Sequence, residues 1–219
     1  MPSYLNHKLP TIWHGGDYNP EQWTSAVWDE DMALMQESRF RVATIGVFSW
    51  AKLEPTEGNF DFEWLDTVIG KLSEANRYFI LATPSAAPPA WMAKKYPEIL
   101  RTGPDRVRRL HGNRVNYNLC SKLYRHKSAL IARKLAERYG NHPGLLAWHL
   151  SNEYGGEDYS EESISAFRDW LKKKYGTLDA LNDAYWTTFW SHCYTEWDQI
   201  SAPGAAYAEG SIQGLTVDW

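Results

Sequence analysis

Four times along the chain, an apolar run typical of a buried β-strand is followed by a segment with helical spacing of apolar residues. The strand-like runs occupy residues 11–18, 41–50, 78–85 and 144–152. Strands that are almost entirely apolar are covered on both faces, which is typical of a parallel sheet under helices. The pattern therefore predicts an α/β fold and leaves two architectures open, a doubly wound sheet and a (β/α)8 barrel.

The intervening segments carry apolar residues three or four positions apart. We expect helices to start after Thr24, to span the apolar stripes at 62–72 and 124–135, to end at Gly176, and to run from 177 to about 186. The long connection at 84–121 is expected to be an ordered loop over a ligand-binding face. Residues 201–219 show no helix or strand pattern. Because a full barrel needs about 250 residues and eight units, a barrel would be half present.

The fourth strand-like run, within "WHLSNEYGG", ends in an amide and a carboxylic acid, Asn152 and Glu153. Parallel sheets and barrels bind ligands beyond the carboxyl ends of their strands. A carboxylic acid at that position can donate a proton, and the amide can hold a sugar hydroxyl. The alternative is that Glu153 caps the following helix or pairs with a nearby arginine.

A site that cleaves glycosides with retention needs a second carboxylate about 5–5.5 Å away. The candidates within the chain are Asp17, Glu21, Glu54 and Glu57, and each is expected to fix a loop rather than act as nucleophile. The segment 101–114 holds five arginines, but aromatic residues do not alternate with them and the formal net charge is −4. These arginines therefore predict a solvated loop and no nucleic-acid partner.

Several other classes of protein are disfavoured by the same sequence. Cys120 and Cys193 form no disulfide framework and match no zinc-ligand spacing, and the seven histidines show no metal motif. No glycine-rich phosphate-binding loop follows a strand. No run approaches the ~20 apolar residues of a membrane span, and no signal peptide is apparent. We expect no metal, no cofactor, no membrane partner and a cytoplasmic location.

Several stretches, taken together and in order, resemble glycoside hydrolase family 42, the β-galactosidases. They are "GGDYNPEQW" (15–23), "IGVFSWAKLEPTEGNFDFEWLD" (45–66), "TPSAAPPAWMAKKYPEIL" (83–100), "AWHLSNEYGG" (147–156) and "FRDWLKKKYGTLDALNDAYWTTFWS" (167–191). The resemblance implies a (β/α)8 TIM barrel, of which about the first four βα units lie in this chain. Residues 1–219 would then be the N-terminal half of a catalytic barrel domain, truncated at its C-terminus.

The resemblance also implies a retaining glycoside hydrolase that removes terminal non-reducing β-D-galactose residues from β-D-galactosides. It assigns the acid/base to Glu153 and substrate binding to Asn152 and to Arg114 in "GNRVNY". The nucleophile of the family is a glutamate after the seventh strand, which lies beyond Trp219. Residues 1–219 alone are therefore expected to be inactive.

Many members of the family hold zinc through cysteines at positions that correspond here to Asn118 and to residues within 155–163. Because none of these is cysteine, we expect no zinc. Trimers are common in the family, so a homotrimer is the candidate assembly of the complete enzyme. Two alternatives stay open: a related glycosidase with another sugar preference, such as a β-glucosidase or α-L-arabinopyranosidase, and a non-catalytic sugar-binding module with exposed tryptophans.

Overall fold

The computed structural model describes residues 5–112, 114–204 and 212–219. Its backbone contacts divide the chain into two compact units. The described residues of the first unit are 5–96, 114–115 and 126–155. Those of the second unit are 97–112, 116–125, 156–204 and 212–219. Each unit is considered by itself.

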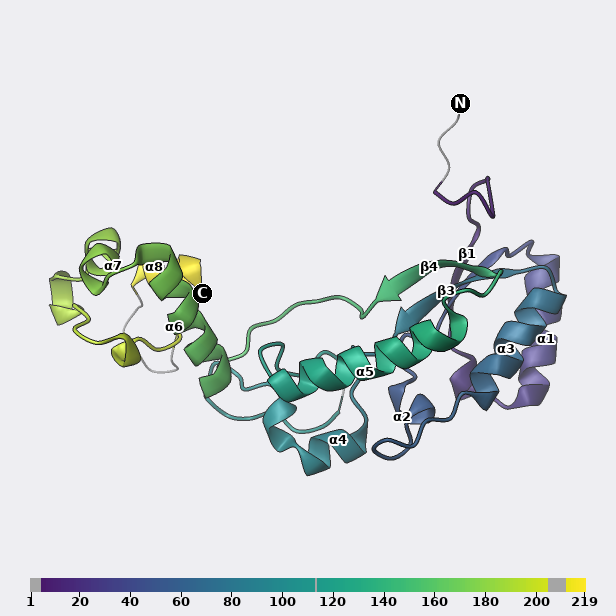
Figure 1. The fold of residues 1–219 in the computed structure, drawn as a ribbon, viewed down its shortest axis with the longest axis horizontal. Helices are drawn as coiled ribbons and strands as arrows, with labels where there is room; N and C mark the ends of the chain where they lie inside the picture. Colours follow the sequence, from purple (N-terminus) through teal and green to yellow (C-terminus); the bar gives the residue numbers. More distant parts are fainter. Residues whose placement is uncertain (1–4, 113, 205–211) are drawn as a thin grey trace. The chain divides into compact units, whose positions relative to one another are not determined.

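A four-stranded parallel sheet forms the centre of the first unit (Figure 1). Its strands lie in the order of the sequence: β1 (Gly15–Tyr18), β2 (Val42–Ile45), β3 (Tyr78–Thr83) and β4 (Leu145–Leu150). The helices between them are η1 (Pro20–Gln22), α1 (Ser25–Glu37), α2 (Trp50–Leu53), α3 (Glu63–Glu74), α4 (Ala90–Lys95) and α5 (Lys122–Tyr139). The predicted α/β fold class and its parallel sheet are confirmed.

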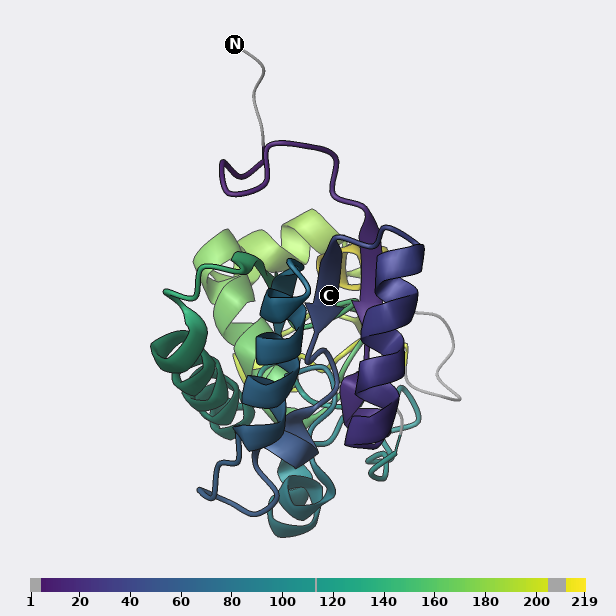
Figure 2. The ribbon, with the colours of Figure 1, turned by 90° about the vertical axis from the view of Figure 1, so that its right-hand side faces the viewer.

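Apolar side chains cover both faces of this sheet. Phe79 and Leu81 of β3 are fully buried, as are Leu65 and Leu72 of α3, and Figure 2 shows α1 and α3 side by side in front of the strands. Alternate residues of a strand point to opposite faces. The neighbours of Phe79 and Leu81 accordingly belong to a different cluster, which consists of Leu9, Trp13, Val42, Tyr78, Ile80 and Leu146.

The second predicted strand, 41–50, is shorter than expected because β2 ends at Ile45. Gly46 follows with φ +82°, a left-handed conformation that side chains with a Cβ rarely adopt. The hydroxyl of Ser49 then donates a hydrogen bond to the Gly46 carbonyl at 3.0 Å, and α2 begins at the fully buried Trp50. The apolar run was correctly read as buried, but half of it forms a turn and a helix.

The second unit is helical. It contains η2 (Pro97–Ile99), α6 (Glu161–Tyr175), α7 (Leu178–Tyr185), η3 (Phe189–Ser191), η4 (Trp197–Gln199) and α8 (Gln213–Asp218). Ser160 caps α6 by accepting a hydrogen bond from the Ser163 amide, and Gly176 ends it with φ +76°. The predicted helices α6 and α7 are present, and their core consists of Phe167, Leu171, Leu181, Tyr185, Ile200 and Leu215.

Two expectations about irregular segments were wrong. The connection at 84–121 contains α4 and η2 rather than loop alone, and residues 213–218 form α8 within a segment expected to have no helix. Tertiary contacts explain α8, because short helices rarely stand on propensity alone. Leu215 is buried, and Asp218 Oδ2 accepts hydrogen bonds from the hydroxyls of Tyr175 at 2.7 Å and Tyr185 at 2.6 Å.

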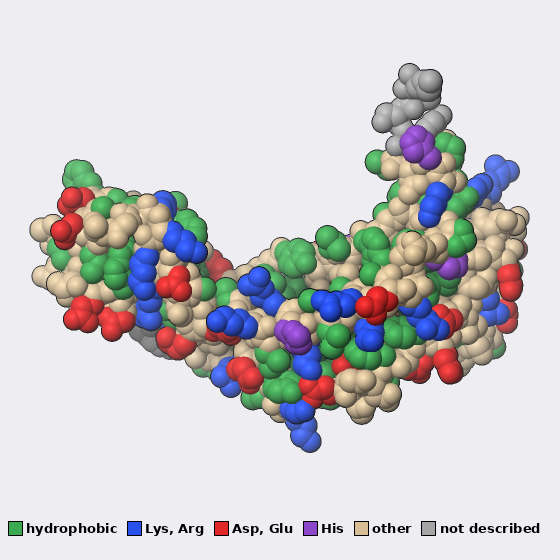
Figure 3. Space-filling view, viewed as in Figure 1, with side chains coloured by type: hydrophobic (Ala, Val, Ile, Leu, Met, Phe, Trp, Pro, Cys, Tyr) green, Lys and Arg blue, Asp and Glu red, His purple; other side chains and the backbone are tan. Residues whose placement is uncertain are grey.

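The surface mixes charges of both signs. Figure 3 shows Lys and Arg side chains interspersed with Asp and Glu over the visible face. Within the part of the chain that the structure describes, no helix combines the length and apolar character that a membrane crossing requires.

Candidate active site

The carboxyl ends of the parallel strands define one edge of the sheet in the first unit. Three segments extend from that edge: 46–49 after β2, 84–86 after β3 and 151–153 after β4. Because parallel strands all end on the same side, side chains from these segments converge. The sequence therefore folds in a way that brings Phe48, Ala86 and Glu153 to a common region.

The backbone that carries Glu153 is held in an unusual conformation. Ser151 is buried and donates its amide to Thr83 Oγ1 at 2.8 Å, which ties the end of β4 to the end of β3. Ser151 has φ +56° and Glu153 has φ +41°. Such left-handed residues cost of order 1–3 kcal/mol each and persist where the surrounding structure imposes them, often at functional sites. Here they direct Glu153 into solvent.

Glu153 forms an ion pair with Arg114. Arg114 Nη2 lies 2.7 Å from Glu153 Oε2, and the side chains are 47% and 66% exposed. The next residue, Val115, has φ +58° and donates its amide to the Ala86 carbonyl at 2.8 Å. Exposed ion pairs contribute about 0–1 kcal/mol to stability, so this pair does little to hold the fold. Both charged groups stay accessible to a ligand.

Of the two alternatives to a catalytic Glu153, one is wrong and the other describes a real contact. Glu153 does not cap the following helix, because α6 begins at Glu161 with Ser160 as its cap. Glu153 does pair with an arginine, and that arginine is Arg114. Asn152 precedes it directly and is half-buried. The three residues proposed from the sequence therefore lie in the same unit, two of them in direct contact.

Phe48 belongs to this site and was missed in the sequence. The guanidinium carbon of Arg114 lies 5.9 Å from the centre of the Phe48 ring, within the range of a cation–π interaction. Phe48 is 38% exposed, whereas Val47, Ser49 and Trp50 around it are buried. An aromatic residue just past a strand end was the available signal, but an apolar run does not show which of its members faces solvent.

Glu54 and Glu57 fix loops, in line with expectation. Glu54 is buried and accepts hydrogen bonds at 2.8 Å from Trp50 Nε1 and from the Gly58 amide. Glu57 accepts hydrogen bonds from Lys127, Lys95 and the Tyr96 hydroxyl. Hydrogen bonds from Lys127, Lys95 and Tyr96, in that order of effect, lower the pKa of Glu57 to about 2. Both carboxylates are occupied by structural partners.

The two acidic residues near β1 differ in environment. Asp17 is an exposed residue of β1. Glu21, in η1, is half-buried, and burial raises its pKa against the opposing effects of a backbone hydrogen bond and Lys52. Among the described residues, the buried Oε2 atom of Glu21 has no hydrogen-bond partner. Glu21 therefore takes up a proton more readily than an exposed glutamate.

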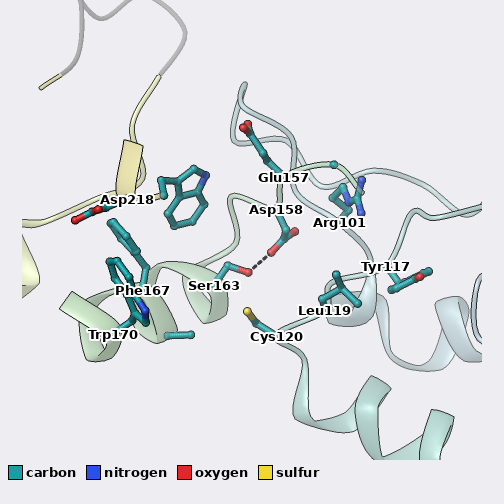
Figure 4. Close-up of a pocket in the computed structure, with 13 residues that line it drawn as sticks. Arg101, Tyr117, Leu119, Cys120, Glu157, Asp158, Ser163, Phe167, Trp170 and Asp218 are labelled. Atoms are coloured by element: carbon teal, nitrogen blue, oxygen red, sulfur yellow. Dashed lines mark hydrogen bonds between the residues drawn. The ribbon is translucent and has the colours of Figure 1, made fainter. Parts of the chain in front are cut away.

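The second unit contains a pocket of about 390 Å³ (Figure 4). Apolar and aromatic side chains, among them Leu119, Phe167, Trp170 and Trp219, form one part of its lining. Polar groups form another, and Figure 4 shows the hydrogen bond between Ser163 and Asp158, whose oxygens are 2.5 Å apart.

The positions that the resemblance relates to zinc-holding cysteines lie beside this pocket and bond to one another. Asn118 is buried, donates to Ser160 Oγ at 3.0 Å and accepts from the Cys120 amide at 2.7 Å. Asp158 accepts from the Thr102 amide at 2.7 Å. Within residues 5–112, 114–204 and 212–219, no three His, Cys, Asp or Glu side chains come together as metal ligands. The expectation of no zinc stays a prediction.

Tryptophans are divided between core and surface. Trp28, Trp50 and Trp64 are buried in the first unit. In the second unit Trp186 and Trp190 are 86% and 70% exposed, with Phe189 between them. Aromatic residues thus supply both core packing and an exposed surface, which bears on the alternative of a sugar-binding module.

Comparison with known proteins decides the family. The model of the family Glyco_hydro_42, described as beta-galactosidase, matches residues 17–219. The chain belongs to glycoside hydrolase family 42. The resemblance seen in the sequence motifs is confirmed, and the four βα units are part of the TIM-barrel architecture of family 42 enzymes.

Two beta-galactosidases from other bacteria are similar to this chain in sequence. The beta-galactosidase BglY of Alicyclobacillus acidocaldarius is 55% identical over 208 residues, which is 94% of this chain and 30% of BglY. The beta-galactosidase GanA of Bacillus subtilis is 48% identical over 209 residues, covering 94% of this chain and 31% of GanA. The chain thus spans about a third of the length of these relatives.

A solved structure from family 42 agrees with the fold described here. Gan42B, a beta-galactosidase from G. stearothermophilus, superposes with a TM-score of 0.96 at 51% identity, over 99% of this chain and 32% of Gan42B. The beta-galactosidase from Rahnella sp. R3 gives the same TM-score at 48% identity, over 99% and 32% of the two chains. The fold is therefore shared with a part of these enzymes.

Proposed function

We propose that this chain supplies the acid/base half of the active site of a retaining β-galactosidase, with Glu153 as the proton donor. The observation that carries the proposal is the placement of Glu153, an exposed carboxyl group at the carboxyl end of β4 that contacts Arg114. Membership in family 42 and the names of the relatives support β-galactosides as the substrates. In this proposal residues 1–219 form the N-terminal part of the catalytic barrel.

In the first step, Glu153 gives its proton to the glycosidic oxygen as the bond from that oxygen to the anomeric carbon breaks. A glutamate from another part of the barrel attacks the anomeric carbon from the opposite face and forms a covalent galactosyl intermediate. The leaving alcohol departs with the proton. In the second step, Glu153 takes a proton from water as the water oxygen attacks the anomeric carbon. The bond from that carbon to the nucleophilic glutamate breaks, which releases galactose and restores both carboxyl groups.

Asn152 and Arg114 bind the sugar in this scheme. The Asn152 amide can donate to and accept from one hydroxyl at once, and we assign it to the 2-hydroxyl, where contacts strengthen towards the transition state. Arg114 offers several N–H donors in a planar fork. Its half-exposed side chain leaves donors free for sugar hydroxyls beside the contact with Glu153.

Two enzymes differing only in sugar preference would share all these features. Galactose and glucose differ at C4, and the roles proposed for Glu153 and Asn152 do not involve the hydroxyl at that carbon. A panel of aryl glycosides, including β-D-glucoside and α-L-arabinopyranoside, tests the preference in the complete protein. We expect the β-D-galactoside to have the highest kcat/KM of the panel. Homotrimer formation, a cytoplasmic location and the absence of a nucleic-acid partner stay predictions.

The first test of the function compares the chain with a longer protein. Purified residues 1–219 should not release nitrophenol from an aryl β-galactoside, because no second carboxylate faces Glu153 in the proposed arrangement. A protein that carries these residues together with the remainder of the barrel should do so. Enzyme-like rates from residues 1–219, abolished by Glu153→Gln, would show that the nucleophile lies within this chain.

A second test separates proton donation from mere support of the fold. Nitrophenolate leaves without assistance, whereas the sugar alcohol of lactose needs a proton. In the complete protein, Glu153→Gln should therefore slow lactose hydrolysis far more than release of nitrophenol in a single-turnover measurement. An equal loss with both substrates would contradict the role of Glu153 as acid.

A further inference from the structure

The turn after β2 holds Phe48 on a rigid base. Gly46 reverses the chain with φ +82°, and the Ser49 hydroxyl closes the turn on the Gly46 carbonyl at 3.0 Å. Val47 and Trp50 anchor the turn from both sides, being 3% and 0% exposed. Phe48, by contrast, is 38% exposed. Its position is therefore fixed by buried neighbours.

Arg114 lies over that ring while it reaches Glu153. Its guanidinium carbon is 5.9 Å from the ring centre, and Nη2 is 2.7 Å from Glu153 Oε2. The Arg114 backbone is also constrained, because Val115 has φ +58° and bonds to the Ala86 carbonyl. The remaining freedom of Arg114 is the rotation of its long side chain, which is 47% exposed.

We propose that Phe48 is a positioning residue that holds the guanidinium of Arg114 in the geometry required for binding the galactoside beside Glu153. The inference rests on the proposed function and adds to it a residue from the turn that follows β2. An aromatic face attracts a guanidinium and allows stacking, while the N–H edge stays directed outward. Phe48 thus acts on the sugar through Arg114.

A flexible arginine binds less well because its side chain must be ordered when the ligand arrives. A ring beneath the guanidinium supplies that order before binding. An exposed cation–π contact corresponds to about a two- to fivefold effect on an equilibrium. Loss of the ring should therefore raise KM for the galactoside by about that factor and leave kcat within about twofold.

The test uses the complete protein that carries residues 1–219 and an aryl β-galactoside. Phe48→Leu removes the ring but keeps an apolar side chain, and it should raise KM by about two- to fivefold. Phe48→Trp keeps an aromatic face and should return KM to within about twofold of the original. In an Arg114→Ala background, Phe48→Leu should have no further effect on KM, because non-additivity measures coupling between the two residues.

Phe60 provides a matched control within the same chain. Phe60 carries a similar contact with Lys134, whose ammonium nitrogen is 5.8 Å from the ring centre, and Phe60→Leu should leave KM unchanged. An unchanged KM in Phe48→Leu would overturn the inference. So would an equal rise of KM in the Arg114→Ala background, since Phe48 would then act independently of Arg114.

A measurement that needs no catalysis separates this inference from the proposed function. Protons above an aromatic ring resonate upfield, so the Arg114 side-chain signals of residues 1–219 should lose an upfield shift in Phe48→Leu and keep it in Phe60→Leu. If the complete protein hydrolyses no galactoside, the function fails while this shift still supports the contact. If the shift is absent, the positioning role fails whatever the activity.

Discussion

Glu54 and Glu153 are both glutamates that follow strands of the same sheet, but they are held in opposite ways. Glu54 is 1% exposed, and both of its oxygens accept hydrogen bonds from residues four positions away, Trp50 and Gly58. Glu153 is 66% exposed, and its partner Arg114 comes from a distant part of the sequence. A carboxylate that stabilises a turn is buried and bonds to residues close in sequence. A carboxylate that can bind a ligand is exposed, and its partner here is distant in sequence.

The backbone shows the same difference. Ser151 and Glu153, which follow the end of β4, both have left-handed backbone conformations, and so does Val115 next to Arg114. Around Glu54 the chain reaches such a conformation at a glycine, Gly58, where it costs little. The structure thus accepts strain at the proposed active site and avoids it at the structural turn.

Loss of the Glu153 carboxyl group should give the largest effect and the sharpest contrast. In the complete protein, Glu153→Gln should lower kcat for lactose by about 10²–10⁴, the usual contribution of a general acid. The melting temperature should change by no more than about 2–4 °C, because an exposed ion pair contributes about 0–1 kcal/mol. Steady-state kinetics and thermal unfolding check both statements. A large drop in melting temperature with retained activity would instead assign Glu153 a structural role.

Glu54→Gln should show the opposite profile. Glutamine keeps one acceptor oxygen and loses the charge, so the hydrogen bonds that Glu54 accepts from Trp50 Nε1 and from the Gly58 amide are weakened or lost. Hydrogen bonds to a charged group contribute about 1.5–3 kcal/mol, so losing one in a chain of this size lowers the melting temperature by roughly 3–12 °C. Thermal unfolding of residues 1–219 followed by circular dichroism measures the shift. An unchanged melting temperature together with lost activity of Glu54→Gln in the complete protein would place Glu54 in the catalytic chemistry instead.

Glu57, a second structural carboxylate, should stabilise the fold in a pH-dependent way. Hydrogen bonds from Lys127, Lys95 and Tyr96 lower the pKa of Glu57 from the ordinary 4.5 to about 2 in the folded chain. A lowered pKa stabilises the fold above about pH 4.5, and this contribution is lost as the pH falls towards 2. Melting temperatures of Glu57→Gln should therefore lie below those of the original at neutral pH and converge with them near pH 2. A constant difference across that range would contradict the linkage.

Val115→Gly should give the smallest effect, with opposite signs for stability and activity. A β-branched residue at φ +58° is strained by roughly 1–2 kcal/mol, and glycine relieves this at an entropic cost of about 0.5–1 kcal/mol. The melting temperature should hold or rise slightly, while KM rises because Arg114 is less well fixed. Thermal unfolding and steady-state kinetics on the same preparations measure the melting temperature and KM. A clear loss of stability would mean that the valine side chain contributes packing that outweighs its strain.

Much of the fold could be predicted because its signals are local. The apolar runs of β3 and β4 and the stripe on α3 identify buried elements from a few neighbouring residues. The turn at Gly46 was missed because its apolar residues are buried in a turn and a helix, where strand periodicity gives no warning. Helix α8 was missed because contacts from Tyr175 and Tyr185 hold it, and those residues lie far from it in sequence.

The residues of the candidate site also differ in how far the sequence predicted them. Position at a strand end was enough to single out Asn152 and Glu153. Arg114 was found through family resemblance, because no spacing rule connects it with Glu153. Phe48 was not found at all, since its role depends on one ring remaining exposed in a run of buried residues.

The sheet order β1-β2-β3-β4 leaves β1 and β4 with a single hydrogen-bonded neighbour each among the described strands. On β4, the side-chain amide of Asn6 donates a hydrogen bond to the Leu146 carbonyl at 2.9 Å, and the Lys8 ammonium donates one to the Leu145 carbonyl at 3.0 Å. A strand added at these carbonyls would therefore have to displace the N-terminal segment that carries Asn6 and Lys8.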